Sequence, residues 1–281
     1  MTEPTVYIVV LNYNGRDLTF QCLNSLQQLH YGNHTILLVD NGSSDGSVEA
    51  ISSAFPAVQV VALPENLGYA RGNNTGLEIA LEHDPDWVMF LNNDTEVDPD
   101  LLAAFMEAAE RVPEGGILGP KIYYGGEEQL LWYAGGEICL PLGRTRHRGI
   151  REHDHGQYDE PDRTDFISGC CLLIRGELVR QLGGFDPAYP MYNEDADLCY
   201  RARQLGVDSY YVPAARVWHY VSSSVGGELS LRKVWLKWQS SMRFFRRYAR
   251  PWYWITILGY QALYYGILGP AKYIRRRWLS R

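Results

Sequence analysis

The sequence predicts an α/β fold built on a mostly parallel sheet. Short apolar runs rich in β-forming residues alternate with segments of helical spacing over roughly the first hundred residues. Such alternation is typical of right-handed βαβ units, whose strands are buried on both faces. The length of 281 residues and the ordinary apolar content suit one large core. We therefore expect one α/β domain over residues 1–227 and a helical tail over residues 228–281.

The amino-terminal half gives the elements that organise this sheet. Strands are expected at 6–11, 35–39, 58–63 and from Trp87, with helices at 18–29 and 48–55 and a further helix ending at Leu81. Each crossover returns the chain, so the loops that follow these strands meet at one edge of the sheet, where ligands bind in open α/β folds. These four polar loops are Asn12–Gly15, Asp40–Ser47, Asn66–Asn74 and Asn92–Thr95.

The second half of the chain is less regular. We expect helices at 101–111, 177–182 and 195–205 and strands at 117–124, 166–174 and 208–212. A turn at Pro213 is expected to separate the last strand from residues 217–220. Between them, residues 125–163 lose the pattern and contain Gly, His and charged residues. We expect this segment to be an insert that contributes to acceptor recognition, a role often placed on irregular surface segments.

Asp94 follows a buried apolar strand that breaks abruptly into Asn92 and Asn93. No basic residue lies near it in sequence, so its oxygens suit a divalent cation that also holds phosphate oxygens. The alternative is an ordinary Asx turn after the strand.

Glu194, Asp195 and Asp197 stand at the start of a predicted helix. Acidic residues there offset the helix dipole. The sharper interpretation makes Asp195 a general base, supported by Glu194, with Asp197 tied into helix or loop structure because it faces another side.

Two further side chains each have two interpretations. His219 is either a half-buried structural histidine or a ligand that, beside a carboxylate, favours Mn²⁺ over Mg²⁺. Arg71 either holds a diphosphate or stabilises its own loop. The glycine-rich segment around Arg71 lacks the lysine of a P-loop, and no Gly-x-Gly-x-x-Gly opens the first helix, which weighs against an NTPase and a dinucleotide dehydrogenase.

Five segments taken together resemble the family 2 glycosyltransferases, and most closely their bacterial rhamnosyltransferase-like branch. They are Val-Leu-Asn-Tyr-Asn-Gly (10–15), Val-Asp-Asn-Gly-Ser-Ser-Asp-Gly (39–46), Glu-Asn-Leu-Gly-Tyr-Ala-Arg-Gly-Asn-Asn (65–74), Leu-Asn-Asn-Asp (91–94) and Asn-Glu-Asp-Ala-Asp-Leu-Cys-Tyr-Arg (193–201). The resemblance runs from about Val6 to His219 with the motifs in the expected order.

The resemblance implies a GT-A fold and an inverting, metal-dependent transfer from a nucleotide sugar. Asp40 is expected to bind the base, Asp94 and His219 to bind Mg²⁺ or Mn²⁺, and Asp195 to deprotonate the acceptor. One departure is Asn92, which replaces the first acid of the Asp-x-Asp motif. The donor-binding residues are expected to be Leu11, Asn12, Tyr13, Asn14, Asp40, Asn66, Gly68, Arg71, Asn74, Asn92 and Asn93.

The implied donor is a dTDP- or UDP-linked sugar, with dTDP-rhamnose favoured, and the implied acceptor is lipid-linked or a polysaccharide. A nucleotidyltransferase using the same nucleotide site and a non-catalytic nucleotide-sugar-binding module are the alternatives. The first would release pyrophosphate, and the second would bind the donor without turnover.

Charge is distributed unevenly along the chain. Residues 228–281 contain 12 Lys and Arg and one Glu, whereas the preceding residues contain 14 Lys and Arg against 32 Asp and Glu. Residues 230–250 form a basic amphipathic pattern, and residues 252–269 are mostly apolar but short for a membrane span. We expect peripheral contact with the anionic cytoplasmic membrane surface rather than a span, and no nucleic-acid partner because the body is acidic.

The cysteine content indicates the compartment. Five cysteines, two of them adjacent at Cys170 and Cys171, do not suggest a disulfide framework. With no signal-peptide pattern in the first residues, we expect a reduced, cytoplasmic protein at the inner face of the cell membrane.

Overall fold

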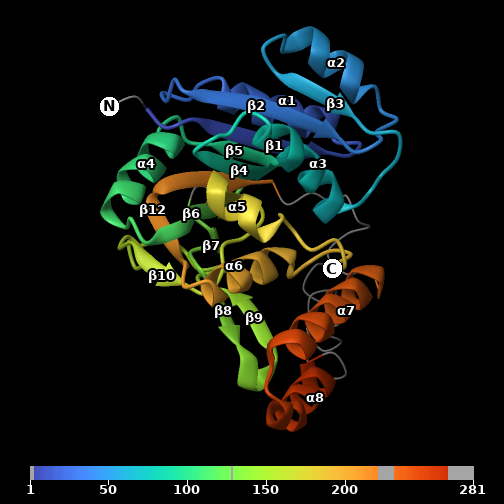
Figure 1. The fold of residues 1–281 in the computed structure, drawn as a ribbon, viewed down its shortest axis with the longest axis vertical. Helices are drawn as coiled ribbons and strands as arrows, with labels where there is room; N and C mark the ends of the chain where they lie inside the picture. The colour runs from blue at the N-terminus through green and yellow to red at the C-terminus, as the bar shows by residue number, and fades with distance from the viewer. Residues whose placement is uncertain (1–2, 128, 221–230, 265–281) are drawn as a thin grey trace.

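The computed structural model describes residues 3–127, 129–220 and 231–264. A mixed ten-stranded sheet lies at its centre, with helices on both faces, and a separate two-stranded hairpin extends from it (Figure 1). The strands are β1 (Val6–Asn12), β2 (His34–Asp40), β3 (Gln59–Ala62), β4 (Trp87–Asn92), β5 (Thr95–Val97), β6 (Gly115–Tyr124), β7 (Leu131–Tyr133), β8 (Gly136–Cys139), β9 (Arg144–His147), β10 (Asp162–Thr164), β11 (Cys171–Arg175) and β12 (Asp208–His219).

The described helices cover the sheet and form the tail. They are α1 (Arg16–Leu26), α2 (Ser47–Ala54), α3 (Tyr69–Leu81), α4 (Leu101–Arg111), α5 (Gly176–Leu182), α6 (Glu194–Gln204), α7 (Leu231–Tyr248) and α8 (Trp254–Leu263), with short 3-10 turns η1 (Leu140–Leu142) and η2 (Pro251–Tyr253).

The order of the strands confirms the predicted α/β architecture. The main path runs β10-β12-β6-β11-β4-β1-β2-β3. Strands β3, β2, β1 and β4 pair in parallel, whereas β11 is antiparallel to both of its neighbours, β4 and β6. The sheet is therefore mixed but mostly parallel, and the carboxyl ends of β1, β2 and β4 lie together at one edge.

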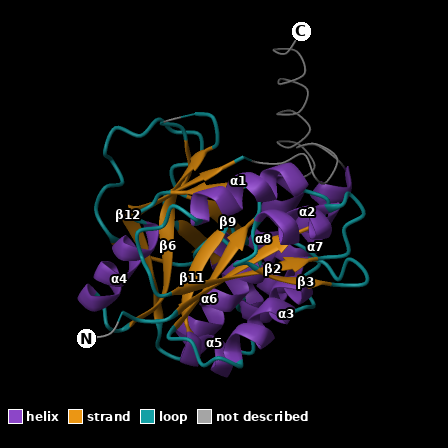
Figure 2. Cartoon of the chain, turned by 90° about the horizontal axis from the view of Figure 1, so that it is seen from above, coloured by secondary structure: helices purple, strands orange, loops and turns teal. Residues whose placement is uncertain are grey.

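Alternate residues of each central strand pack on opposite faces of the sheet. Ile8 and Val10 of β1 belong to the core beneath α1, α2 and α4, whereas Val9 belongs to the core beneath α3, α5 and α6. Figure 2 shows the helices gathered on both sides of the strands. This burial of both strand faces explains why β1 and β2 are nearly continuous apolar runs.

Helix α3 begins at Tyr69, earlier than predicted, so Arg71–Gly76 is helical rather than a loop. The glycines here serve packing. A Cβ on Gly72 would lie 2.6 Å from Leu11 Cδ1, and one on Gly76 would lie 2.4 Å from Val9 Cγ1. They therefore allow α3 to approach β1 closely, which a loop interpretation of a glycine-rich segment overlooks.

Two strand predictions also differ from the structure. The strand predicted at 208–212 does not end in a turn at Pro213. It continues to His219 as β12, through an irregularity in its pairing with β6 between Val212 and Arg216. The predicted strand at 166–174 shortens to β11, because the chain turns at Ser168 before Cys171.

The insert is folded against the sheet. Strand β7 pairs with β6, and buried Lys121 on β6 places its ammonium 2.8 Å from a carboxylate oxygen of Asp154 and beside Asp159. The hairpin of β8 and β9 extends from this region toward the tail helices (Figure 1).

The described part of the tail packs on this body. Phe244 and Phe245 of α7 are fully buried in the core that contains α6. Gln261 of α8 donates a 2.8 Å hydrogen bond to the Gly143 carbonyl in the hairpin. The predicted tail residues 228–230 and 265–281 lie outside the described part of the chain. Within the described ranges, the helices are too short or too polar to span a bilayer.

Candidate active site

Asn12, at the end of β1, connects three of the four polar loops. Its buried side-chain amide donates to an Asp40 carboxylate oxygen at 2.7 Å. Its side-chain oxygen accepts from Asn93 at 3.0 Å and from the Thr19 hydroxyl at 3.0 Å. Asp40 also accepts from the Ser43 backbone amide at 2.8 Å. The structure therefore brings Asn12, Asp40 and Asn93 together, as predicted.

The loops on either side of this centre are also tied to each other. Asn41 donates to the Asn66 side-chain oxygen at 3.0 Å and to the Gly68 carbonyl at 3.2 Å. Asn14, with a positive φ of 49°, accepts from the Ser44 backbone amide at 2.8 Å. All four loops thus meet at one sheet edge, in the arrangement that parallel strands dictate.

Four other predicted donor-binding residues do not all lie in the hydrogen-bonded centre of the loops. Tyr13 is exposed beside Asn14, and Leu11 packs against Gly72 of α3. Arg71 is an exposed residue of α3. Asn74 uses its side chain to bind both backbone groups of Phe185, at 2.8 and 2.9 Å, so the structure assigns it a contact with the segment after α5 rather than with the loops.

Asp94 and His219 are brought together by pairing between β5 and β12. Thr95 pairs with His219, which places the Asp94 carboxylate 3.1 Å from the His219 imidazole nitrogen Nε2. Both residues are buried, at 8% and 7% exposure, and the Nδ1 of His219 has no hydrogen-bond partner among the described residues.

This pair fits one divalent cation. Two ligands at right angles on an ion with bonds of about 2.1 Å stand about 3.0 Å apart, close to the spacing seen here. The described residues contain no group of three or more His, Cys, Asp or Glu side chains arranged for a metal. Mg²⁺ commonly takes few protein ligands and completes its shell with substrate phosphates and water, so two donors suffice for such a site.

A short stretch of backbone, Gly169–Cys170, connects Asp195 to the end of β4, which directly precedes the loop containing Asp94. The Asp195 carboxylate accepts from the Gly169 amide at 2.9 Å, and the carbonyl of the next residue, Cys170, accepts from the Asn92 amide at 2.9 Å. Tyr69 donates to the Gly169 carbonyl at 2.7 Å. Burial raises the pKa of Tyr69, and the charges of Glu194, Asp195 and Asp94 raise it further. Tyr69 therefore lies close enough to both carboxylates for each of their charges to act on it.

Desolvation raises the pKa values of the two neighbouring acids Glu194 and Asp195. Desolvation raises the pKa of Asp195 above 3.8, although amide hydrogen bonds oppose the shift. Glu194 is 6% exposed, and one of its carboxylate oxygens has no hydrogen-bond partner among the described residues. Its pKa is raised well above 4.5, by desolvation first and then by the charge of Asp195.

An unusual backbone turn places this pair. Tyr192 and Asn193, directly before α6, both have positive φ values, 71° and 61°. Positive φ is unfavourable for a tyrosine and costs about 1–3 kcal/mol in such regions. The turn lets α6 begin at Glu194, at the edge where the loops meet.

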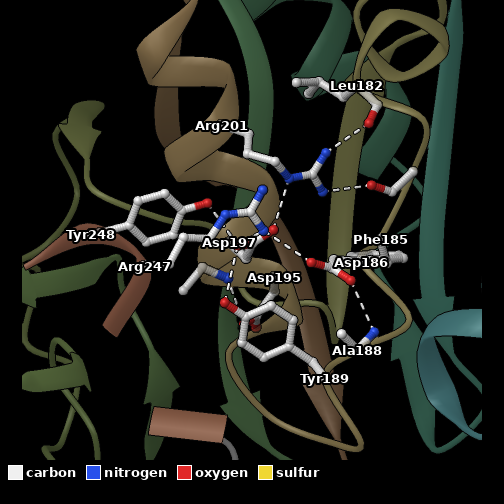
Figure 3. A network of polar contacts seen from close by, with 12 residues as sticks. Leu182, Phe185, Asp186, Ala188, Tyr189, Asp195, Asp197, Arg201, Arg247 and Tyr248 are labelled. Atoms are coloured by element: carbon white, nitrogen blue, oxygen red, sulfur yellow. Dashed lines mark hydrogen bonds and ion pairs between the residues drawn. The ribbon is translucent and has the colours of Figure 1, made fainter. Parts of the chain in front are cut away.

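Asp197 has a structural role, as predicted. Fully buried, it accepts from Tyr248 at 2.7 Å, from Tyr189 at 3.0 Å and from the Arg201 Nε at 2.7 Å (Figure 3). Arg247 of α7 lies 3.2 Å from the same carboxylate. Asp197 thus joins α6 to α7 and to the segment after α5.

Sequence reasoning missed several residues of this site. Tyr69 and Gly169 were assigned no role, although Gly169 is held between Tyr69 and Asp195, where a Cβ would lie 2.7 Å from the tyrosine hydroxyl. A polar Ser-Gly break inside a run otherwise typical of a strand was the available signal. The hydroxyl of Thr19 hydrogen-bonds to the side chains of Asn12 and Asn93, but no sequence motif around Thr19 indicates this role.

The arrangement supports one kind of chemistry. A half-buried carboxylate with a raised pKa, Asp195, is connected through the Gly169–Cys170 backbone to the loop that carries the acid–imidazole pair. The first can accept a proton from an attacking group, and the second can hold an anionic leaving group.

Comparison with known proteins supports this geometry. Residues 7–183 match the model of the family described as "Glycosyl transferase family 2". The chain is 34% identical over 209 residues to the N-acetylglucosaminyl-diphospho-decaprenol L-rhamnosyltransferase of Mycobacterium tuberculosis, and the match covers 68% of each protein.

Two solved structures share the fold. GalNAc-T7 with UDP, GalNAc and Mn²⁺ superposes with a TM-score of 0.60 at 19% identity, over 77% of this chain and 44% of that one. The mannosyltransferase PcManGT from Pyrobaculum calidifontis, in complex with GDP-Man and Mn²⁺, also gives a TM-score of 0.60, at 18% identity, over 93% of this chain and 70% of that one. The fold is GT-A, and the family match over residues 7–183 shows that the chain belongs to glycosyl transferase family 2.

Proposed function

We propose that the protein is an inverting, metal-dependent glycosyltransferase. The observation that supports this proposal is that one short backbone segment, Gly169–Cys170, bonds both to Asp195 and to Asn92, two residues before Asp94. An inverting transfer needs one base opposite the leaving group, whereas a glycoside hydrolase needs a pair of carboxylates at a set spacing. We assign the role of that base to Asp195, supported by Glu194.

The proposed donor is a nucleotide-diphosphate sugar, most specifically dTDP-rhamnose. The rhamnosyltransferase relative supports rhamnose as the transferred sugar. The two similar solved structures, which contain UDP or GDP-Man, support a nucleotide-diphosphate sugar as the class of donor. The proposed acceptor is a hydroxyl of a lipid-linked or polysaccharide glycan, because the relative's name contains a diphospho-decaprenol.

The chain's own residues have distinct parts in the proposed mechanism. Asp40 and Asn12 hold the nucleotide end, and Asp195 takes the proton from the acceptor hydroxyl as that oxygen bonds to the anomeric carbon. The bond from that carbon to the nucleotide diphosphate breaks, and the electron pair leaves with the phosphate. Asp94 and His219 would hold Mg²⁺ or Mn²⁺, which neutralises the charge of the departing diphosphate.

The first prediction tests the donor and the metal together. We expect dTDP to raise the melting temperature of the protein more with Mn²⁺ than without it, because Asp94 would hold the cation and the cation would neutralise the charge of the diphosphate. Asp94→Asn should remove this metal-dependent increment. Asp100→Asn, a matched change at an exposed carboxylate six residues downstream, should retain it. The measurement is thermal unfolding monitored by fluorescence, repeated with UDP and GDP.

Two results would contradict the proposal. Equal stabilisation of the wild-type protein with and without Mn²⁺ would remove the metal from the function. Release of pyrophosphate from a nucleoside triphosphate, with no sugar transfer, would favour a nucleotidyltransferase.

We also propose that the protein associates peripherally with the inner face of the cytoplasmic membrane. Large apolar side chains near the described end of the tail are exposed, including Trp252 at 63%, Ile255 at 84% and Leu258 at 54%. Exposed Arg243 lies on the preceding helix, α7, and exposed Arg250 lies just before Trp252. Such a combination suits an anionic lipid surface.

Fractionation of cells tests the association. We expect high salt to release part of the protein from membranes, because charge contributes to a peripheral contact. Replacing Trp252 and Ile255 by Ser should move the protein to the soluble fraction. Protein that salt never releases and that requires detergent would exclude the peripheral form.

A further inference from the structure

Lys237 occupies the inward face of α7, where the helix leaves the core. Ser240, Ser241, Phe244 and Phe245 are all buried, and their spacing defines the side of α7 that faces the body. Lys237 stands three and four residues before the two serines and therefore shares that side. Unlike them it remains exposed. The inward face of α7 thus ends in a lysine whose side chain is exposed in part, while its ammonium is surrounded by enough protein to be partly desolvated.

The neighbours of this face place Lys237 near the start of α6. The side-chain amide of Asn193, directly before Glu194, donates to the Ser241 hydroxyl at 3.3 Å. From the opposite side, Thr145 of β9 donates to the Asn193 oxygen at 3.0 Å. His147 lies two residues beyond Thr145, on the same face of β9. Lys237 and His147 are therefore the next inward residues on the two elements that meet at Asn193.

The electrostatics of His147 agree with this placement. Burial lowers its pKa to about 3, and the positive charge of Lys237 is the next largest cause. A histidine with this pKa is neutral at physiological pH, so it does not repel an anion held by the lysine.

A row of rings leads from His147 back to the proposed metal pair. The Trp132 ring is 4.5 Å from the His147 ring and 4.6 Å from the His219 ring, edge to face in both cases. His219 contacts Asp94 at 3.1 Å. Lys237 therefore stands at the insert and tail side of the site, across Trp132 from the acid–imidazole pair.

Lys237 lacks a carboxylate partner within the described chain. None of the ion pairs formed by the described residues includes it, and desolvation lowers its pKa with no acid acting to raise it. A partly desolvated ammonium without a counterion carries a cost that a bound anion would offset. Its compact charge with three donors suits phosphate oxygens.

We propose that Lys237 binds a diphosphate in the active site, from the side formed by α7 and the insert. This inference rests on the proposed function and adds to it a role for α7 in substrate binding. Two substrates of that reaction carry the same chemistry: the nucleotide-sugar donor and a diphospholipid acceptor. The ammonium holds the diphosphate in either case, and the two sources differ in which substrate loses affinity when the charge is removed.

The test compares three variants of the full-length protein by calorimetry. Lys237→Gln removes the charge, Lys237→Arg keeps it, and Arg246→Gln is a matched control that removes an exposed charge elsewhere on α7. The probes are dTDP with Mg²⁺ for the donor diphosphate and farnesyl diphosphate for the lipid diphosphate. We expect Lys237→Gln to weaken one of the two by about tenfold, the range of a hydrogen bond to a charged group. Lys237→Arg should recover most of it, and Arg246→Gln should bind like wild type.

Each outcome has one meaning. Selective loss of dTDP binding assigns Lys237 to the donor, and selective loss of farnesyl diphosphate assigns it to the acceptor. If the wild-type protein binds dTDP and Lys237→Gln binds both probes equally well, the inference is wrong while the proposed function stands. If the wild-type protein binds neither probe, the proposed function and the inference both fail. If Lys237→Gln and Arg246→Gln lose the same amount of affinity, the loss reflects the overall charge of α7 rather than a contact made by Lys237. That result would also overturn the inference.

Discussion

Asp195→Asn is expected to lower sugar transfer by about 10²–10⁴-fold while leaving the affinity for dTDP within about twofold of wild type. The amide keeps the shape of the side chain and can still accept from the Gly169 amide, which lies 2.9 Å from the carboxylate. It cannot accept the proton of the acceptor hydroxyl. The change therefore removes the base without moving the loops that hold the nucleotide.

The measurements are single-turnover transfer to a lipid-linked acceptor and calorimetry with dTDP. Glu177→Gln, at an exposed acid in the first turn of α5, is the matched control and should transfer at the wild-type rate. Turnover retained by Asp195→Asn would remove Asp195 from the role. A parallel loss of dTDP affinity would instead indicate that the substitution disturbs the fold of the site.

The pH dependence of the wild-type enzyme gives a second readout of the same residue. The base acts in its ionised form, and desolvation raises the pKa of Asp195 above 3.8. The acid side of the profile of kcat/KM should therefore fall at a higher pH than an exposed aspartate would allow. Activity should be lost as the pH decreases through that raised pKa and recovered as it increases.

The polar loops of the donor side could be predicted from sequence because their geometry is local. Asn12 and Asp40 each stand directly after an apolar run, and parallel pairing of β1 with β2 places residues 12 and 40 opposite each other. Asn93 follows β4, the other neighbour of β1. A strand end plus the rule for parallel sheets is enough to bring such residues together.

The remaining parts depend on contacts between distant segments. Tyr69 reaches Gly169 across 100 residues, and Asn74 reaches Phe185 across 111 residues. Neither contact leaves a periodicity or spacing signal, so Asn74 was grouped with the donor loop although it holds the chain after α5. The start of α3 was predicted too late for the same reason. Gly72 and Gly76 allow α3 to pack closely on β1, and that contact cannot be read from the sequence around them.

The tail shows the same limit. Its basic and apolar pattern indicates a helix with one apolar side, and α7 is such a helix. The pattern does not say what that side contacts. Lys237 is part of the basic pattern that predicts a charged outer face, yet it lies on the side of Ser240 and Ser241, which contact Met191 and Asn193.

Asp197→Asn should lower the free energy of unfolding by about 3–5 kcal/mol, the usual cost of removing one partner from a buried ion pair. Asp197 is fully buried, and the side chain of Arg201 is 14% exposed. Arg201 is also fixed by the carbonyls of Leu182 and Gly184, at 2.7 and 2.6 Å, so it cannot turn to water when the carboxylate is lost. The uncompensated charge would remain inside.

Urea unfolding followed by circular dichroism measures this loss. The matched control is Asp84→Asn, which removes a carboxylate that pairs with Arg180 but is 94% exposed. Surface pairs contribute about 0–1 kcal/mol, so this variant should unfold close to wild type. A similar loss of unfolding free energy in the two variants would show that the buried network around Asp197 stabilises the protein no more than a surface ion pair does.

The same variant tests whether α7 is part of the catalytic domain or a separate unit beginning at residue 228. Asp197 accepts from Tyr248 and lies beside Arg247, so it is the polar connection between α6 and the end of α7 (Figure 3). If α7 belongs to the core, Asp197→Asn should lower the midpoint of one cooperative transition and also weaken the diphosphate binding assigned to Lys237. An early, separate transition for the tail, with the diphosphate affinity unchanged, would instead support an independent unit. Because Phe244 and Phe245 are fully buried in the same core as α6, we expect the single transition.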